Sequence, residues 1–277
     1  MTGRVSLAAL GWLMACPLAA GSLPAQQRPS AVTPLFPRYS ASQLECSAFA
    51  ESSRSEIRTE SGGRVRQAKA GRDGIWHFRS RDTAAGVAIE GWYDSLAVWQ
   101  RSEGSAVAPD TDGLIGGRYR GLLGRAGRYR PADRPFVPDE VSEVVDAAAA
   151  LDDLFPPLPP RALLPGQRWS DSTGTEITRL PDSLAGRRLQ RYALRIHQVS
   201  RETTPRGDTV PIAVRQTSVE EGEVTWDPAA GLVRRARGIT VETDIPIGGR
   251  VRQAVRSRVS QRTTLIRLAA RDRGCSG

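Results

Sequence analysis

Residues 250–262 read RVRQAVRSRVSQR, and this stretch decides the fold. Side chains alternate between the two faces of an extended chain, so Val251, Val255 and Val259 share one face. The opposite face carries Arg250, Arg252, Arg256, Arg258 and Arg262. Strands with one apolar and one charged face are typical of antiparallel sheets, because parallel strands covered on both sides are apolar throughout. The stretch therefore predicts a strand of an antiparallel sheet.

Further strands with turns between them are expected in both halves of the chain. Gly71–Gly74 predicts a hairpin turn, and Asp227–Gly231 predicts a second turn with suitable residues. Around the first turn we expect strands at 64–70, 75–81, 87–93 and 96–101. The chain should therefore form a meander of short strands.

One helix is expected, over residues 139–154. Pro138 suits a first-turn position, and Asp139 and Glu140 favour the positive end of a helix. Apolar residues then recur at helical spacing, and the proline-rich segment 155–160 ends the pattern. The fold class predicted is α+β and mostly β: a curved antiparallel sheet or half-barrel with this main helix packed on it.

The chain is expected to form a single β-rich domain at residues 38–270, after a signal peptide at 1–25 and a flexible lead-in at 26–37. Within it we expect a first β half at 38–135, the helix, a proline-rich connection at 155–165 and a second β half at 168–270. A short tail follows at 271–277.

The first residues have the layout of a secretory signal peptide. Met1–Arg4 is short and basic, Val5–Ala15 is apolar, and small residues follow as far as Ala25. Cleavage after Gly21 or Ala25 would release a periplasmic or extracellular protein. The alternative is lipidation at Cys16, which would produce an outer-membrane lipoprotein.

Two further cysteines, Cys46 and Cys275, lie near the two ends of the expected domain. An even number of cysteines in an oxidising compartment predicts a disulfide between them. The alternative is two unpaired cysteines, one in a strand and one in the tail.

Arginine dominates the charge of the chain. Lysine and arginine number 39 against 30 acidic residues, the net charge is +9, and Lys69 is the only lysine. The candidate anion-binding residues are Arg118, Arg120, Arg128, Arg130, Arg250, Arg252, Arg256 and Arg258. Their partner would be a lipid, lipopolysaccharide or an acidic glycan, since an exported protein seldom meets nucleic acid. Two alternatives are coding bias and a wet sheet face on which arginines pair with acids such as Glu242 and Asp244.

The sequence offers no catalytic, cofactor or metal site. His77 and His197 occupy solvent-side strand positions in the expected pattern, and neither stands in a metal-binding motif. Asp110–Gly113 resembles part of a calcium loop but lacks its distal ligands, so a turn is favoured. The acids between Glu220 and Glu223 are interpreted as a solvated loop.

The chain resembles an uncharacterised family of exported bacterial proteins. The resemblance lies in the proline-rich segment Phe155–Trp169, which ends in Pro-Gly-Gln-Arg-Trp, and in Trp226-Asp227-Pro228 with the late Thr263-Thr264-Leu265. It implies a β-rich exported protein and supplies no catalytic residues. By architecture alone, the expected fold is also similar to the half-barrel of periplasmic lipoprotein carriers, whose concave face holds acyl chains.

The function expected is a non-enzymatic binding or structural role in the envelope, with an amphiphilic or anionic ligand. Trp76, Phe78, Trp226 and Ile239 are the candidate apolar ligand face, although a sheet must bury one face in any case. The alternatives are a carboxylate-dependent hydrolase and a purely structural interaction module. A carrier needs an apolar cavity and a hydrolase needs converging carboxylates.

Overall fold

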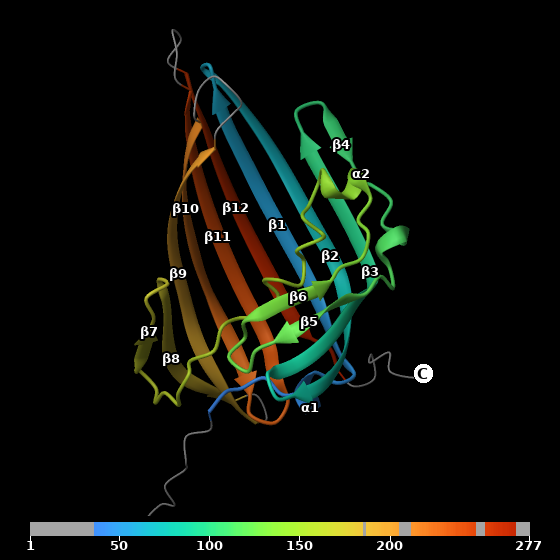
Figure 1. Cartoon of the computed structure of the whole chain (residues 1–277), viewed down its shortest axis with the longest axis vertical. Helices are drawn as coiled ribbons and strands as arrows, with labels where there is room; N and C mark the ends of the chain where they lie inside the picture. The colour runs from blue at the N-terminus through green and yellow to red at the C-terminus, as the bar shows by residue number, and fades with distance from the viewer. Residues whose placement is uncertain (1–35, 185–186, 205–211, 248–252, 270–277) are drawn as a thin grey trace, which may run out of the picture. The chain divides into compact units, whose positions relative to one another are not determined.

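The computed structural model describes residues 36–184, 187–204, 212–247 and 253–269. Twelve strands form one sheet in the order β6-β5-β3-β2-β1-β12-β11-β10-β9-β8-β7, with β4 attached to β3, and every pair of strands is antiparallel (Figure 1). Within the described residues the elements are α1 (Ala41–Leu44), β1 (Ser47–Ser61), β2 (Arg64–Thr83), β3 (Gly86–Ser102), β4 (Ser105–Val107), η1 (Asp112–Leu114), β5 (Tyr119–Leu123), β6 (Tyr129–Asp133), α2 (Asp139–Ser142), β7 (Arg168–Ser170), β8 (Thr175–Leu184), β9 (Arg188–Thr204), β10 (Ile212–Asp227), β11 (Gly231–Ile247) and β12 (Gln253–Arg267). This confirms the predicted fold class in its main part, a mostly β chain built on a curved antiparallel sheet.

β1 and β12, the first and last strands along the chain, pair with each other at the centre of the sheet. Their register runs from Phe49 opposite Arg267 to Ser61 opposite Val255. The pairing joins the strands of the first β half to those of the second, so one continuous sheet results. None of the helices in the described residues is long and apolar enough to cross a membrane.

The strands are longer than the sequence predicted. β2 runs without a break through Gly71 and Gly74, where a hairpin turn was expected, and β3 likewise runs through the expected gap between Tyr93 and Leu96. A Cβ atom at Gly71 would lie 2.5 Å from the ring of Trp99 on β3. The glycine is therefore needed for the close approach of an aromatic neighbour across the strand pair, and not for a turn.

The expected helix over 139–154 is reduced to one turn. α2 spans only Asp139–Ser142, and turns follow as far as Leu154. The carboxylate of Asp146 accepts a hydrogen bond of 3.0 Å from the backbone N–H of Ala149. This local bond competes with helical hydrogen bonding and favours a turn.

The segment 134–165, named here the strap, still packs on the sheet as the helix was expected to. We name the face of the sheet under the strap the inner face and the opposite one the outer face. The buried strap residues include Val141, Ala147, Ala150, Leu151, Leu154, Phe155, Leu158 and Leu163. The hydroxyl groups of Tyr119 and Tyr39 donate hydrogen bonds to the carbonyl oxygens of Ala147 and Pro156. Apolar burial and these bonds together hold the strap in place.

The core lies between the strap and one end of the inner face. Its aromatic residues contact one another closely: the rings of Trp76 and Tyr93 are 3.8 Å apart and those of Tyr39 and Trp226 are 5.1 Å apart, centroid to centroid. Trp76 and Phe78 share one face of β2, as the sequence predicted, and both are fully buried.

The outer face is polar along the central strands. On β12, Arg256 and Arg258 are exposed, while Val255 and Val259 on the other side are half-buried, which agrees with the predicted alternation. Arg258 pairs with Glu242 at 3.7 Å, and Arg256 lies 4.0 Å from Asp244. Val251, Arg250 and Arg252 lie outside the described residues.

Candidate functional site

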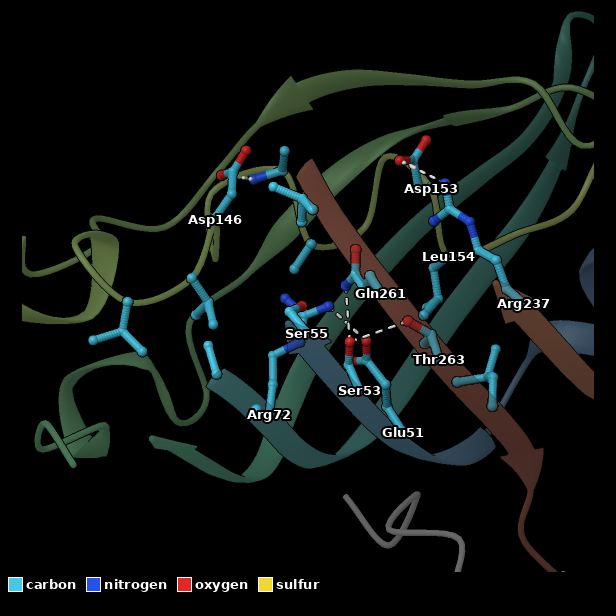
Figure 2. Close-up of a pocket in the computed structure, with 18 of the residues that line it drawn as sticks. Glu51, Ser53, Ser55, Arg72, Asp146, Asp153, Leu154, Arg237, Gln261 and Thr263 are labelled. Atoms are coloured by element: carbon cyan, nitrogen blue, oxygen red, sulfur yellow. Dashed lines mark hydrogen bonds and ion pairs between the residues drawn. The ribbon is translucent and has the colours of Figure 1, made fainter. Parts of the chain in front are cut away.

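A cavity of about 350 Å³ lies between the inner face and the strap (Figure 2). Its floor is formed by β1, β2, β11 and β12, and its roof by strap residues between Val144 and Leu154. The cavity exists because the strap crosses the four central strands at a place where their inner side chains are small or polar.

A cluster of uncharged polar groups occupies the centre of the floor. Ser53 of β1 stands opposite Thr263 of β12 in the strand register, and their hydroxyl oxygens are 3.1 Å apart. The side-chain amide of Gln261 donates a hydrogen bond of 2.8 Å to the hydroxyl oxygen of Ser53. These groups offer donors and acceptors to a molecule in the cavity.

One wall of the cavity is built around the carboxylate of Glu51, which is 3% exposed. It accepts hydrogen bonds from the Arg72 guanidinium at 2.5 Å, the Trp76 indole N–H at 2.9 Å and the Tyr93 hydroxyl at 3.2 Å. Burial lowers the pKa of Arg72, but its interactions with Tyr93 and Glu51, which include a hydrogen bond to Glu51, more than offset it, so the net shift is upward. Arg72 therefore stays charged and neutralises Glu51 inside the fold.

The opposite wall is built around Glu220 of β10, whose carboxylate lies behind the lining. Arg235 and Arg237 of β11 each place a guanidinium nitrogen 2.8 Å from one of its two oxygens. Burial lowers the pKa of the Arg235 guanidinium and the neighbouring Arg237 charge lowers it further, while Glu220 acts in the opposite direction. Arg237 also lies 3.2 Å from the Asp153 carboxylate at the end of the roof.

Apart from Ser55 and the roof carboxylate of Asp146, the rest of the lining is apolar. The roof contributes Val144, Val145, Ala149, Ala150 and Leu154, and the floor contributes Ile57, Ala70, Val259 and Leu265. The cavity thus combines a floor of mixed polarity and two charged walls with a roof that is mainly apolar and carries Asp146 and Asp153. Such an arrangement can bind a small molecule that has both polar and apolar parts.

The lining carboxylates are each held by donors of the protein. Glu51 has three donors, Asp153 faces Arg237, and Asp146 accepts from the backbone N–H of Ala149. A general acid or base must reach a substrate proton and have a pKa suited to the transfer. Their existing hydrogen bonds engage these groups in the structure, so the geometry suits binding better than proton transfer.

The predicted apolar ligand face is core. Trp76, Phe78 and Trp226 are at most 1% exposed and do not line the cavity. Ile239 is half-buried on β11, on the same face of the strand as Arg237 and Val241. The aromatic residues stabilise the end of the sheet beside the cavity and contribute no side chain to its lining.

The structure places the predicted anion-binding arginines elsewhere. Arg118 and Arg120 pair with Glu90. The guanidinium carbon of Arg118 also lies 3.9 Å from the centroid of the Trp92 ring. Arg128 and Arg130 are exposed near β6. None of the four lines the cavity.

The histidines differ from each other. His197 is exposed, as expected, but His77 is only 6% exposed and its ring stacks on Trp92 at 5.8 Å between centroids. The solvent-side prediction for His77 was wrong because the neighbouring strand supplies an aromatic cover.

The segment that resembles a calcium loop is a turn at the start of η1, in which Asp110 accepts a hydrogen bond from the backbone N–H of Asp112. Among the described residues, no three histidine, cysteine or acidic side chains gather as metal ligands.

The charged groups of the cavity were missed by sequence reasoning. Glu220 was expected in a solvated loop, but it lies within β10 and is 7% exposed. Arg235 is 5% exposed and Glu51 is buried as well. One signal was available: Glu51 shares strand parity with Phe49 and Ile57, which places it on the apolar face of β1.

No protein-family model and no curated protein matches the chain. Among solved structures, the chain is similar to a structure of lipid–protein interactions in lipovitellin, with 12% sequence identity and a TM-score of 0.43. The match covers 81% of this chain, and this chain spans 25% of the length of the lipovitellin chain. A similarity of this degree assigns the chain to no family, and the resemblance to exported bacterial proteins stays a prediction.

Proposed function

We propose that this protein is an exported, non-enzymatic binding protein that holds one small amphiphilic molecule in the cavity under the strap. The observation that carries the proposal is the lining: polar groups at the centre of the floor and on the walls, and mainly apolar side chains on the roof, around about 350 Å³. This volume is at the lower end of the range of small-molecule sites, roughly 300–1,000 Å³, so a lipid with two acyl chains is too large.

Two buried donors favour an acceptor on the ligand. The Nε atoms of Arg72 and Arg237 are buried and have no hydrogen-bond partner among the described residues. Buried donors are normally satisfied, since an unmade hydrogen bond costs about 1–3 kcal/mol. An acceptor of the ligand would satisfy them when the guanidinium groups turn toward the cavity.

The balance of charge allows the ligand one negative charge. Two arginines, Arg235 and Arg237, surround the single buried carboxylate of Glu220. The other acid near Arg237 is Asp153, whose side chain is 72% exposed and therefore screened by solvent. A carboxylate or a similar monoanionic group would replace the solvent-exposed carboxylate of Asp153 beside Arg237, while the apolar part would contact Leu154 and Val259.

The hydrolase alternative receives less support from the same geometry. The lining carboxylates are each occupied by a different protein donor. A structural module without a ligand is the outcome that the following experiment would reveal.

The test is decanoate binding to the delipidated mature protein, measured by isothermal titration calorimetry. We expect one site per chain, and we expect Ala149→Trp to remove binding because the indole would fill the cavity from its roof. Ala148→Trp is the matched control, since Ala148 is also half-buried but does not line the cavity. Val144→Phe fills the same space from a second position if Ala149→Trp does not fold.

The proposal also predicts what the native protein carries. Solvent extraction of protein purified from its own cell envelope should release a stoichiometric single-chain amphiphile, identified by mass spectrometry. Failure to bind decanoate, together with an empty extract, would leave the structural module as the remaining interpretation.

Export is part of the proposal and rests on residues 1–25, which lie outside the described residues. The mass of the mature protein from a bacterial host distinguishes cleavage after Gly21 or Ala25 from lipidation at Cys16. Full-length protein in the cytosol would contradict export.

A further inference from the structure

A second hollow, of about 810 Å³, lies on the outer face where β2, β3, β5 and β6 run side by side. It is separate from the cavity, since the two share no lining residue. Its floor contains Ala88, Leu122 and Pro131, and its basic residues are Arg79, Arg81, Arg120 and Arg130.

One row of side chains crosses this hollow. The strand register places Arg81 of β2 opposite Ala88 of β3, Ala88 opposite Leu122 of β5, and Leu122 opposite Arg130 of β6. We name these four residues the outer row. It begins and ends in an arginine, and its two middle residues are apolar and half-buried.

The arginines at the two ends of the outer row are available for a partner. Arg81 and Arg130 are exposed, and neither has an ion-pair partner among the residues that the structure describes. By contrast, Arg120 in the neighbouring row is held by Glu90 at 2.7 Å and by Asp133 at 3.3 Å. Of the acids in the hollow, Glu90 is thus engaged, and Glu45 accepts from the backbone N–H of Ser80. The hollow therefore has an excess of positive charge.

The spacing of the outer row selects a class of partner. Three strand-to-strand steps of about 4.8 Å separate the backbones of Arg81 and Arg130 by about 14 Å. In an extended peptide, residues i and i+4 are also about 14 Å apart and point to the same side. Residue i+2 between them would face the apolar middle of the row.

We infer that the outer row is a docking site for an extended acidic peptide segment of another protein, with acidic residues at positions i and i+4 and an apolar residue at i+2. The two carboxylates would pair with Arg81 and Arg130, since arginine binds carboxylates bidentately. Single-stranded nucleic acid fits less well, because the lining contains no aromatic side chain on which a base could stack.

The test uses synthetic seven-residue peptides labelled with a fluorophore and measured by fluorescence anisotropy at low salt. The peptides carry a central leucine and two aspartates spaced i,i+4, with isomers of the same composition spaced i,i+2 and i,i+6. We expect the i,i+4 peptide to bind about five-fold more tightly than either isomer, and binding to weaken as salt rises.

Variants of the protein separate a specific site from general attraction to a basic chain. Arg81→Gln and Arg130→Gln should each weaken binding of the i,i+4 peptide about five-fold. Arg128→Gln is the matched control, because Arg128 is exposed nearby but does not line the hollow, and it should have no effect. These arginines are exposed, so the variants should fold.

Three results would overturn the inference. The first is equal binding of the three peptides, and the second is a loss of peptide binding in Arg128→Gln as large as in Arg81→Gln or Arg130→Gln. The third is displacement of the labelled peptide by an acidic polysaccharide at a lower concentration of negative charge than unlabelled i,i+4 peptide requires. Decanoate binding in the Arg81→Gln variant should match that of the unaltered protein. Failure of this docking site is thereby distinguished from failure of the cavity as a binding site.

Discussion

The guanidinium of Arg235 donates a hydrogen bond of 3.0 Å to the backbone carbonyl oxygen of Leu154. The same guanidinium group also donates to the carbonyl oxygen of Asp153 and pairs with Glu220. A buried arginine of β11 thus ties the end of the strap to the sheet. Because hydrogen bonds to charged groups are worth more than neutral ones, this tie holds the cavity roof more firmly than apolar contact alone would.

Replacing Arg235 should loosen the strap. We expect Arg235→Met to lower the free energy of unfolding by about 3 kcal/mol, since it removes a buried charge that has both carboxylate and carbonyl partners. Amide hydrogen exchange, followed by mass spectrometry, should show faster exchange in residues 147–158. Arg234→Met is the control: Arg234 is exposed on the opposite face of β11, and its replacement should change stability by less than about 0.5 kcal/mol. Equal exchange in the two variants would contradict the tie.

Neutralising Glu51 should destabilise the other wall of the cavity. Glu51→Gln leaves the Arg72 charge without its buried counter-ion, which we expect to cost about 3–5 kcal/mol in urea unfolding. Glu56→Gln tests an exposed acid on the same strand, 3.3 Å from Lys69, and should cost less than about 0.5 kcal/mol. Adding Arg72→Met to Glu51→Gln should recover part of the loss, because the uncompensated charge is then gone. A strictly additive loss would show that the two charges do not depend on each other.

The tyrosines predict a steep loss of stability at high pH. Burial is the main cause that raises the pKa of all five, which are Tyr39, Tyr93, Tyr119, Tyr129 and Tyr192. For three of them the raised pKa is about 12. The folded state thus holds the phenolic proton more tightly than the unfolded state, whose pKa is about 10. This contribution to stability is complete below pH of about 10 and is lost as pH rises toward about 12.

Tyrosinate absorbance measured beside circular dichroism checks this prediction. The two signals should change together in one cooperative transition above pH of about 10, whereas the chain in denaturant should titrate gradually. Ionisation of most tyrosines in a protein that keeps its sheet signal would show that the rings are accessible to solvent.

We predict a disulfide between Cys46 and Cys275. The backbone N–H of Leu268 donates a hydrogen bond of 2.9 Å to the carbonyl oxygen of Ala48, which brings the chain after β12 next to the start of β1. Cys275 itself lies outside the described residues. Alkylation of the unfolded, unreduced protein should leave both cysteines unlabelled, and prior reduction should add two labels. In the chain-entropy model the cross-link stabilises the fold by up to about 5 kcal/mol, so Cys275→Ser should lower the melting temperature. Labelling of both thiols without reductant would contradict the bond.

Local patterns predicted the β architecture correctly but placed the ends of strands poorly. The alternation at 254–262 survives in β12 because the two-residue period of a strand does not depend on which strand pairs with it. The turn at Gly71–Gly74 was wrong because glycine has two uses that look alike in a sequence. Only the register, which sets Gly71 opposite Trp99, shows that this glycine makes room for a ring.

The candidate site was less predictable than the fold. Its charged walls depend on pairs far apart in the sequence, such as Glu51 with Arg72 and Glu220 with Arg235. A local pattern identifies a charged residue in a strand but not the neighbour that neutralises it. The shortened helix combines both causes, because the local bond of Asp146 favours a turn and the turns place Val144 and Val145 against the cavity.

By itself the sequence determined that this chain forms an antiparallel sheet with one apolar and one charged face, because side-chain alternation is a property of each strand alone. The tertiary structure alone decided which charges are buried and where a cavity is left. Both depend on strand register and on the path of the strap, and those are set by long-range packing that no local pattern records.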